Sequence, residues 1–334
     1  MGKELQFGGV IINGSVEHAV ALEKAGFDTI WVYDHLQHWS DRDGVRNPEL
    51  CPMSLVILPL VLDKVRCPVG TSVLCPLFRY HPAVIAQYFA QLDYLFPNRI
   101  LLGVGTGEAM CEAPLLGGEF PPYKERAARL VEAVDIMRRL WSSDEYVEYK
   151  GQYYEITTLK LFLKPKGKIP IIISAIGRQS AKIAGEIGDG LMTMSPVEKV
   201  RNEILPEFER AARAAGKKPE EMPKIAWVLG GVVEFSERIL KAMRRAAPWA
   251  NEKVFSEMDP RKIDKLAEEI SKEDLLRVNL LTESVDELIG RIEEYVRAGM
   301  NHIAFYDVTN IVRGKPLEVP AMWRERILPY FKEL

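Results

Sequence analysis

The stretch EKAGFDTIWVYD (residues 23–34) returns near the other end of the chain as VRAGMNHIAFYD (residues 296–307), and IAGEIGDGLMTM (residues 183–194) is a looser copy. Each stretch has the pattern of a helix end closed by glycine, a short turn and an apolar strand. A rotationally repeated barrel uses one such junction again and again around its axis, so the recurrence favours a barrel. Part of the similarity also follows from the general preference of helix ends for glycine.

Outward from these junctions, short β-branched runs alternate with longer amphipathic segments along nearly the whole chain. This alternation is typical of βα units around a parallel sheet, and several runs are apolar on both faces, as buried strands are. Eight strands each followed by a helix predict an α/β fold, a (β/α)8 TIM barrel, with a doubly wound sheet as the rival. The strands are expected at residues 5–12, 29–33, 69–74, 100–104, 169–173, 191–194, 225–233 and 302–305.

Two stretches interrupt the alternation. Aromatic residues alternate around a Lys-Gly turn near residues 145–167, which predicts a hairpin insertion. Helix formers dominate near residues 237–277, which predicts a helical insertion. Because no flexible linker separates either stretch from the rest, we expect a single barrel domain over residues 1–334. The other helices are expected at residues 15–26, 83–96, 124–141, 179–188, 284–299 and 322–334.

The composition excludes several classes of protein. The 334 residues are 47% hydrophobic and 27% charged, with a net charge of -3, which is typical of a globular protein without general attraction to nucleic acid or membranes. No apolar stretch approaches the length of a membrane helix or a signal-peptide core, so we expect a cytoplasmic location. Four cysteines stand singly, which argues against a metal site and suits a reducing compartment. They are Cys51, Cys67, Cys75 and Cys111.

In a TIM barrel, catalytic side chains come from the loops at the carboxyl ends of the strands. VYDHLQHW (residues 32–39) ends the second expected strand and offers Asp34, His35, His38 and Trp39. A histidine with a pKa near neutrality can take a proton from a substrate hydroxyl, and a neighbouring aspartate or tryptophan can orient it or exclude water. The structural alternative is a capping aspartate beside a surface histidine.

The loop after the third expected strand, GTSVLCPLFRYHP (residues 70–82), begins with small side chains. Gly70, Thr71 and Ser72 allow a flat ligand to approach the backbone. Arg79 is either a partner for a phosphate or half of a structural salt bridge, and the salt bridge is the commoner role.

The loop after the fourth expected strand is rich in glycine (GVGTGEAMCE, residues 103–112). Such a loop can cradle a phosphate, with Thr106 and Gly107 at its tip. It matches neither G-x-G-x-x-G nor the lysine of a P-loop, so it does not predict a dinucleotide or nucleotide site of those kinds. Glu108 is a candidate proton donor if burial raises its pKa, and otherwise a helix-starting carboxylate.

The loop after the fifth expected strand leads straight into a helix (SAIGRQSAKIAG, residues 174–185). Free amides and the positive end of the helix dipole make a helix N-terminus an anion site. We therefore expect a phosphate near Ala175, Gly177 and Arg178, with a plain helix cap as the alternative.

Taken together and in order, four stretches resemble the luciferase-like superfamily. The resemblance is to its coenzyme F420-dependent dehydrogenases, the branch that contains glucose-6-phosphate and secondary-alcohol dehydrogenases, and it runs over nearly the whole chain. It implies a (β/α)8 barrel with insertions. The stretches are Asp34-His35 followed by Trp39, GTSVLCPLFRYHPAVIAQ (residues 70–87), PNRILLGVGTGEAM (residues 97–110) and AGEIGDGLMT (residues 184–193).

The resemblance implies transfer of a hydride from a substrate carbinol carbon to C5 of the deazaflavin of coenzyme F420. In that reaction His35 would take the hydroxyl proton, Trp39 would cover the site and favour the developing charge, and Glu108 would give a proton to the deazaflavin ring. The resemblance also implies a cis peptide bond between Ser72 and Val73, behind the ring.

The resemblance implies further contacts with the cofactor, and the chain departs from the family pattern at some of them. Ile176 replaces a second glycine, Arg178 adds a charge, and Cys75 and Cys111 stand where threonine and asparagine are usual; Asn13 stands where an acidic residue is usual. The implied cofactor contacts are Asp34, Ser72, Val73, Cys75, Thr106, Gly107, Cys111, Ala175, Ile176, Gly177 and Arg178.

The substrate is where the departures matter most. Relatives that act on sugar 6-phosphates hold the phosphate with three basic residues, and the resemblance puts Val197, Val254 and Val278 at those positions, with Lys253 and Arg277 one residue away. A phosphate would lose most of its charge-assisted hydrogen bonds, each worth roughly 1.5 to 3 kcal/mol. We therefore expect an uncharged alcohol or an unphosphorylated polyol as substrate.

Four alternatives stay open. The first is an F420-dependent glucose-6-phosphate or other sugar-phosphate dehydrogenase. The second is a methylene-tetrahydromethanopterin reductase, the third is an FMN-dependent luciferase-like monooxygenase, and the fourth is a cofactor-binding protein without catalysis. The resemblance also implies a homodimer formed through barrel helices.

Overall fold

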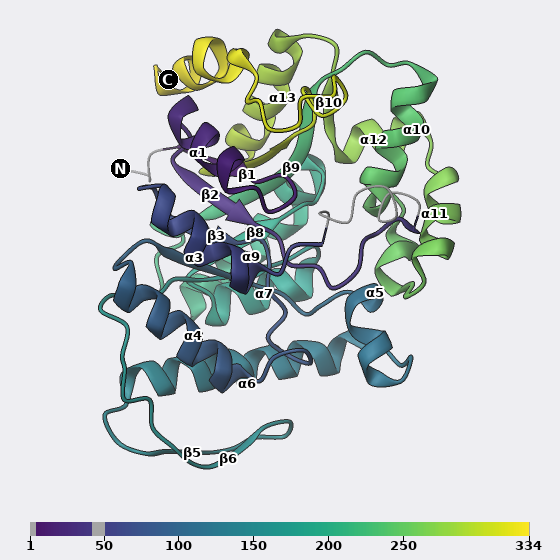
Figure 1. The fold of residues 1–334 in the computed structure, drawn as a ribbon. Coiled ribbons are helices and arrows are strands. Elements are labelled where there is room, and N and C mark those ends of the chain that lie inside the picture. Colours follow the sequence, from purple (N-terminus) through teal and green to yellow (C-terminus); the bar gives the residue numbers. More distant parts are fainter. Residues whose placement is uncertain (1–4, 42–50, 334) are drawn as a thin grey trace.

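The computed structural model describes residues 5–41 and 51–333. Eight parallel strands follow one another around a barrel, and the last, β11, pairs with the first, β1 (Figure 1). The predicted (β/α)8 barrel is confirmed, and each expected strand is present. The barrel strands are β1 (Gln6–Val10), β2 (Thr29–Val32), β3 (Val69–Thr71), β4 (Ile100–Val104), β7 (Ile171–Ser174), β8 (Gly190–Thr193), β9 (Lys224–Val232) and β11 (His302–Asp307).

Helices cover the outside of the barrel (Figure 1). The helices α3 and α9 are additional to those expected, and the terminal helix is split into a π-helical turn at Trp323–Ile327 and α14 (Leu328–Lys332); residue 334 lies outside the described residues. Within the described ranges, no helix is both long and apolar enough to cross a membrane. The outer helices are α1 (Val16–Ala25), α3 (Ser54–Lys64), α4 (Pro82–Leu95), α6 (Tyr123–Ser142), α7 (Arg178–Ile187), α9 (Leu205–Ala214) and α13 (Val285–Ala298).

The two closest copies of the repeated junction share one backbone geometry. Ser15 and Ser284 cap α1 and α13, and each side-chain oxygen accepts a hydrogen bond from the backbone N–H three residues later. The helices end at Gly26 and Gly299, whose φ angles of 100° and 107° favour glycine. The looser copy differs, because Gly188 after α7 has φ -75° and an extended backbone. The first two copies are therefore similar in backbone structure as well as in sequence.

The interior of the barrel is packed with side chains. Trp31, Ile172, Met192 and Ile225 belong to a cluster of buried residues that fills it. At the amino-terminal end, the indole N–H of Trp31 donates a hydrogen bond to the hydroxyl of Thr29 at 3.0 Å. Because the interior is filled, we expect ligands to bind among the loops at the ends of the strands.

The segment expected as a hairpin contains β5 (Val147–Lys150) and β6 (Glu155–Leu159), which pair antiparallel and extend away from the barrel at the bottom of Figure 1. The carboxylate of Glu132 on α6 accepts hydrogen bonds from the backbone N–H groups of residues 152 to 154 in its turn. This contact fixes the turn of the hairpin to the barrel helices.

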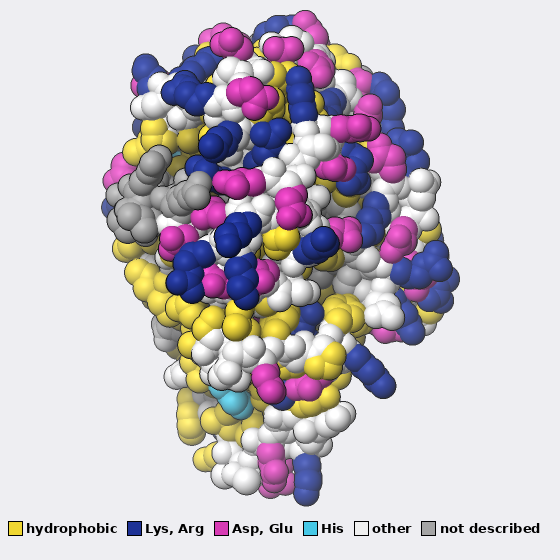
Figure 2. All heavy atoms as spheres, turned by 90° about the vertical axis from the view of Figure 1, so that its right-hand side faces the viewer, with side chains coloured by type: hydrophobic (Ala, Val, Ile, Leu, Met, Phe, Trp, Pro, Cys, Tyr) yellow, Lys and Arg dark blue, Asp and Glu magenta, His cyan; other side chains and the backbone are white. Residues whose placement is uncertain are grey.

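The expected helical insertion contains α10 (Glu237–Ala246), α11 (Pro260–Glu268) and α12 (Lys272–Val278), with two 3-10 turns between α10 and α11. The face of the molecule on its side carries intermingled basic and acidic side chains (Figure 2), and its buried apolar residues form one hydrophobic cluster with residues of the barrel such as Trp39 and Leu229. A short strand that was not predicted, β10 (Leu280–Thr282), follows the insertion and pairs parallel with the end of β9. The insertion therefore lies over the carboxyl end of the barrel.

Candidate active site

A cavity of about 560 Å³ lies at the carboxyl ends of the barrel strands, beneath the helical insertion. Loops after β2, β3, β4 and β7 line one part of it, and residues of α10 and the neighbouring 3-10 turns line the other. Ala175, Gly177 and Arg178 are not in its lining. The predicted site residues that do line it are Asp34, His35, Trp39, Ser72, Val73, Cys75, Thr106, Gly107, Glu108, Cys111 and Ile176.

His35 and Glu108 face each other in this cavity. His35 comes from the loop after β2 and Glu108 from the loop after β4, and their Nε2 and Oε2 atoms lie 3.6 Å apart. The ring of Trp39 stands nearly perpendicular to that of His35, with centroids 6.2 Å apart. The structure therefore brings together the three residues for which catalytic roles are expected.

Burial moves the pKa values of this pair in opposite directions. It raises the pKa of the Glu108 carboxyl to about 8; the Glu112 carboxylate adds to this rise and Arg79 opposes it. Burial lowers the pKa of His35 to about 3, and the charges of His38 and Arg79 act in the same direction. Near neutral pH the imidazole is therefore unprotonated while the carboxyl keeps its proton, which is the arrangement that a base and an acid require.

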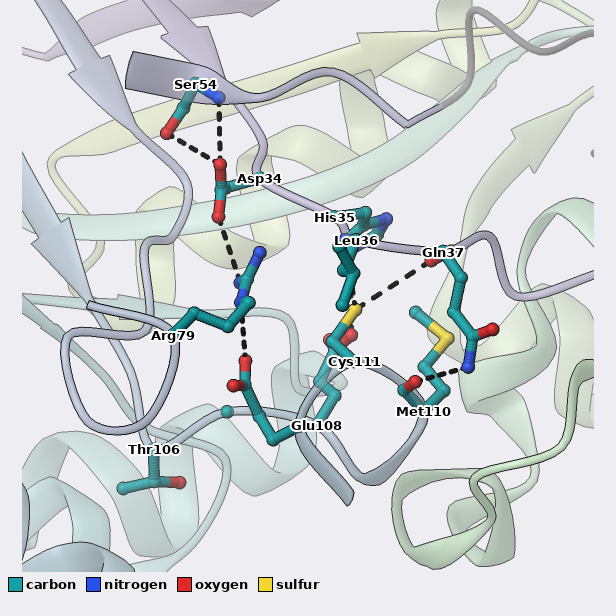
Figure 3. Close-up of polar contacts among 12 residues, drawn as sticks. Asp34, His35, Leu36, Gln37, Ser54, Arg79, Thr106, Glu108, Met110 and Cys111 are labelled. Atoms are coloured by element: carbon teal, nitrogen blue, oxygen red, sulfur yellow. Dashed lines mark hydrogen bonds and ion pairs between the residues drawn. The ribbon is translucent and has the colours of Figure 1, made fainter. Parts of the chain in front are cut away.

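Arg79 joins the two loops that carry the pair. Its guanidinium lies 2.9 Å from Asp34 Oδ2 and 3.0 Å from Glu112 Oε1, and the side chains of both carboxylates are 1% exposed. Asp34 Oδ1 in turn accepts hydrogen bonds from the backbone N–H and the hydroxyl of Ser54 at the start of α3 (Figure 3). Arg79 therefore forms the structural salt bridge that was expected as its commoner role. Asp34 fixes the loop that carries His35.

Cys111 makes a second connection between these loops. Its Sγ accepts a hydrogen bond from the backbone N–H of Leu36 at 3.4 Å and lies 3.8 Å from the carbonyl oxygen of Gln37 (Figure 3). The Gln37 side chain donates to the carbonyl of Met110 in the short helix α5 (Ala109–Glu112). The position of His35 relative to Glu108 is thus held by several polar contacts.

The wall opposite the insertion is made of small residues and backbone. The peptide bond between Ser72 and Val73 is cis, as the family resemblance implied. Gly107 has φ 79°, and a Cβ atom there would lie 2.9 Å from the sulfur of Cys75. Arg126 on α6 also lines the cavity, and it donates a hydrogen bond to the Thr106 hydroxyl at 3.1 Å, which holds this loop.

The expected phosphate site at the start of α7 has a different local structure. The backbone N–H groups of Ile176 and Gly177 donate to the hydroxyl of Ser180, both at 3.2 Å, and the N–H of Arg178 donates to the Glu203 carboxylate at 2.8 Å. Only Ile176 of these expected contacts lines the cavity. The amides predicted to hold an anion are therefore bonded within the protein.

Several residues of the cavity were not expected from the sequence. Arg126 and Tyr123 come from the first turns of α6, and Trp227 comes from the middle of β9. Trp249 and Phe255 come from the insertion. None of them lies in a loop that follows a strand, so the rule that site residues follow strands could not predict them. Only the aromatic residues of the predicted insertion indicated that it could contribute to the site.

The three valines at the positions implied for phosphate binding do not line the cavity. Val197, Val254 and Val278 are buried elsewhere. Lys253 and Arg277 are exposed, and Arg277 lies 3.5 Å from Asp274 on its own helix.

The sequence of this chain is similar to those of known proteins. A family model described as luciferase-like monooxygenase matches residues 8–302. The F420-dependent glucose-6-phosphate dehydrogenase of Amycolatopsis mediterranei (strain U-32) is 35% identical over 323 residues, which cover 95% of this chain and 92% of that protein. The protein of the same name from Mycolicibacterium gilvum (strain PYR-GCK) is 39% identical over 297 residues, which cover 87% of each chain.

Solved structures agree with these relatives. An F420-dependent secondary alcohol dehydrogenase in complex with an F420-acetone adduct matches with a TM-score of 0.90 and 29% identity, over 98% of this chain and 99% of that chain. A coenzyme F420-dependent tetrahydromethanopterin reductase from Methanopyrus kandleri, with a TM-score of 0.72 and 19% identity over 98% of this chain and 100% of that chain, shares the fold. The chain belongs to the luciferase-like monooxygenase family.

Proposed function

We propose that the chain is a coenzyme F420-dependent oxidoreductase that removes a hydride from the carbinol carbon of an alcohol, polyol or sugar. The observation that carries this proposal is the pair of His35 and Glu108, which lie 3.6 Å apart in the cavity with pKa values moved in opposite directions. The dehydrogenases named above, which act with the same coenzyme, support it.

The cavity has the features that such a cofactor needs. Ser72 Oγ and Glu108 Oε2 are buried polar atoms without a hydrogen-bond partner among the described residues. Beside them, Gly105 and Val73 line the cavity and pack against each other, since a Cβ atom on Gly105 would come within 2.9 Å of the Val73 side chain. We propose that the ring is held by Ser72, Val73, Cys75, Thr106, Gly107 and Cys111. We propose that the tail passes Ala175, Ile176 and Gly177 and meets the exposed side chain of Arg178, since the backbone N–H groups at this helix start are bonded within the protein.

When bound, coenzyme F420 supplies a hydride acceptor. The chain's own residues manage the protons. Nε2 of the unprotonated His35 accepts the hydroxyl proton of the alcohol as the hydride leaves its carbinol carbon, which becomes a carbonyl carbon. Glu108 keeps a proton on its carboxyl group and would donate it to the deazaflavin ring after the hydride transfer. Trp39 covers His35 and excludes water.

Coenzyme binding and turnover test this proposal together. Titration of the purified protein with oxidised F420 should show saturable binding, and an added alcohol should then bleach the chromophore. Saturable binding of FMN with no binding of F420 would instead favour a monooxygenase. Binding of F420 without reduction by any alcohol would favour a cofactor-binding protein, and unchanged behaviour of Glu108→Gln would agree with that result.

Two other reactions use the same coenzyme. A sugar-phosphate dehydrogenase would oxidise glucose 6-phosphate in preference to uncharged alcohols, and the curated relatives have this activity in their names. A methylene-tetrahydromethanopterin reductase has no alcohol proton to remove, so loss of all activity in His35→Ala would count against it.

We also propose a homodimer formed through α3 and α4. Val56 and Leu60 on α3 are 55% and 51% exposed, and Val84 on α4 is 55% exposed, so an apolar surface spans both helices. The two helices are neighbours, because the Tyr88 hydroxyl on α4 donates to the carbonyl of Leu55 on α3. Sedimentation should give twice the mass of the chain for the native protein and a single chain for Leu60→Lys; a single chain for the native protein would refute the dimer.

A cytoplasmic location is likewise a proposal. The four cysteines are free thiols, which suits a reducing compartment. Fractionation of the producing cells should recover the protein with cytoplasmic markers.

A further inference from the structure

The part of the cavity beneath the insertion is walled by aromatic rings. The Trp39 centroid lies 6.4 Å from that of Trp249 and 6.0 Å from that of Phe255, and Trp227 lies 5.8 Å from Trp249. Met243 on α10 also lines this part. We call this part, defined by Trp39, Trp227, Met243, Trp249 and Phe255, the aromatic chamber.

No residue that defines the aromatic chamber carries a charge, and the cations of the cavity are engaged elsewhere. Among the described residues that line the cavity, the only lysines or arginines are Arg79 and Arg126. Arg79 is paired with Asp34 and Glu112, and Arg126 donates to the loop after β4. The face of the molecule shown in Figure 2 carries basic and acidic side chains. A phosphate in this chamber would lack a cationic partner.

The chamber also offers few hydrogen bonds. The side chains that define it offer indole N–H donors and no oxygen acceptor, and the indole N–H of Trp227 is buried without a partner in the described residues. The hydroxyl groups of Tyr306, whose ring stacks on that of Trp227, and of Ser256 also line the cavity. A polyol brings several hydroxyl groups, and each buried hydroxyl that finds no partner lowers affinity by about tenfold or more. Hydrocarbon rings, by contrast, gain from contact with aromatic walls.

We propose that the substrate is an uncharged alcohol with a largely hydrocarbon, ring-bearing frame, which occupies the aromatic chamber with its hydroxyl at His35. This inference rests on the proposed function and narrows its substrate class, excluding sugar phosphates and polyols. The alcohol loses a hydride with its electron pair to the coenzyme and a proton to His35, and leaves as a ketone. The indole N–H of Trp227 can serve one further acceptor on the frame.

A substrate panel tests this directly. We expect cyclohexanol and borneol to reduce F420 with kcat/KM at least about tenfold above sorbitol and glucose 6-phosphate. A preference for sorbitol or glucose 6-phosphate overturns the substrate class while leaving the proposed function intact. If none of these compounds, nor isopropanol, reduces bound F420, the proposed function fails and the substrate class fails with it.

The size of the chamber can be tested by filling it. Ala246 on α10 lines the cavity, and Ala246→Leu adds bulk beside Met243. We expect the ratio of kcat/KM for borneol to that for isopropanol to fall by about tenfold or more. The matched control is Ala321→Leu at an exposed site away from the cavity, which should leave the ratio unchanged. An unchanged ratio in Ala246→Leu would place the frame outside the chamber.

Binding gives a readout that does not depend on turnover. Three of the chain's six tryptophans border the chamber, so a ligand there alters intrinsic fluorescence. Camphor, the ketone formed from borneol, should change the fluorescence saturably in the protein without coenzyme, and Ala246→Leu should weaken this binding more than Ala321→Leu does. A response to glucose 6-phosphate but not to camphor would overturn the proposal.

Discussion

His35 and Glu108 show how burial can divide the roles of two neighbouring side chains. With ordinary pKa values, a glutamate is ionised at neutral pH and favours the protonated form of a neighbouring histidine. Here the pKa of His35 falls to about 3 and that of Glu108 rises to about 8, since a charge on either group is poorly solvated in the cavity. The uncharged pair is ready to accept one proton and to give another.

At the residue scale, we predict that His35→Ala lowers kcat/KM for alcohol oxidation by about 10²- to 10⁴-fold, because His35 is the proposed base for the hydroxyl proton. His38→Ala should change it far less, because His35 is the histidine that faces Glu108, whereas Nδ1 of His38 accepts a hydrogen bond from the backbone N–H of Ser40. Steady-state reduction of F420 measures both. Equal losses in the two variants would contradict the choice of His35 as base.

The pH profile is a second prediction at this scale. Activity needs the protonated form of Glu108, so kcat/KM should fall as pH rises through about 8. Protonation of His35 should reduce activity only at much lower pH, toward about 3. Glu108→Gln cannot titrate, so its lower activity should be flat across the alkaline range. If the alkaline fall persists in Glu108→Gln, another group is responsible.

These two residues were predictable because each lies in the loop that follows a strand, where a barrel places its catalytic groups. Trp227 was not, because it lies within β9 and its place in the cavity depends on how the strands tilt and close. The anion site at Gly177 and Arg178 was predicted from the general rule that the free N–H groups of a helix N-terminus bind anions. In the structure these N–H groups donate to the side chains of Ser180 and Glu203. Glu203 lies far along the chain, so its contact carried no local signal.

At the scale of elements, Arg79 connects the loops after β2, β3 and β4. Replacing it with methionine leaves the buried carboxylates of Asp34 and Glu112 without a cation, which should lower the free energy of unfolding by about 3–5 kcal/mol. The matched control is Arg139→Met, which removes an exposed ion pair with Asp135 and should cost at most about 1 kcal/mol. Chemical denaturation measures both, and equal losses would contradict a structural role for Arg79.

Two helical glycines give another prediction at this scale. Gly185 on α7 packs against α9, and a Cβ atom there would overlap the Phe208 carbonyl and approach the Ala211 side chain to 2.8 Å. Gly185→Ala should therefore destabilise the protein by about 1–3 kcal/mol. Gly290 on α13 has no atom within 4 Å of such a position, so Gly290→Ala should stabilise it by about 0.5–1 kcal/mol. Thermal unfolding distinguishes the two, and the same sign of shift would contradict this packing.

The elements also differ in how clearly the sequence predicts them. The helices α1 and α13 have both a serine cap and a left-handed glycine, so their bounds follow from local chemistry. The strand β10 has three residues, too few for an alternating pattern to show. It forms because β8 ends early and leaves the end of β9 unpaired, and that depends on the tertiary structure.

At the scale of the whole molecule, a barrel with a repeated junction supplies the loops of the site. A helical insertion lies over these loops, and the residues it adds to the cavity are mostly apolar. The barrel contributes the charged groups of the cavity, and the aromatic wall is shared between Trp39 and Trp227 of the barrel and Trp249 and Phe255 of the insertion. A cavity with one polar and one apolar side suits a reaction in which a cofactor ring and an uncharged alcohol meet at His35 and Glu108.

The most direct test of this account follows one hydrogen atom. The protein is mixed with oxidised F420 and an alcohol that carries deuterium at its carbinol carbon, in ordinary water, and the reduced coenzyme is analysed by mass spectrometry after a single turnover. We predict that the coenzyme gains the deuterium, and that His35→Ala slows this transfer by about 10²- to 10⁴-fold. A coenzyme that stays oxidised with every alcohol, or that gains only hydrogen from water, would contradict the account.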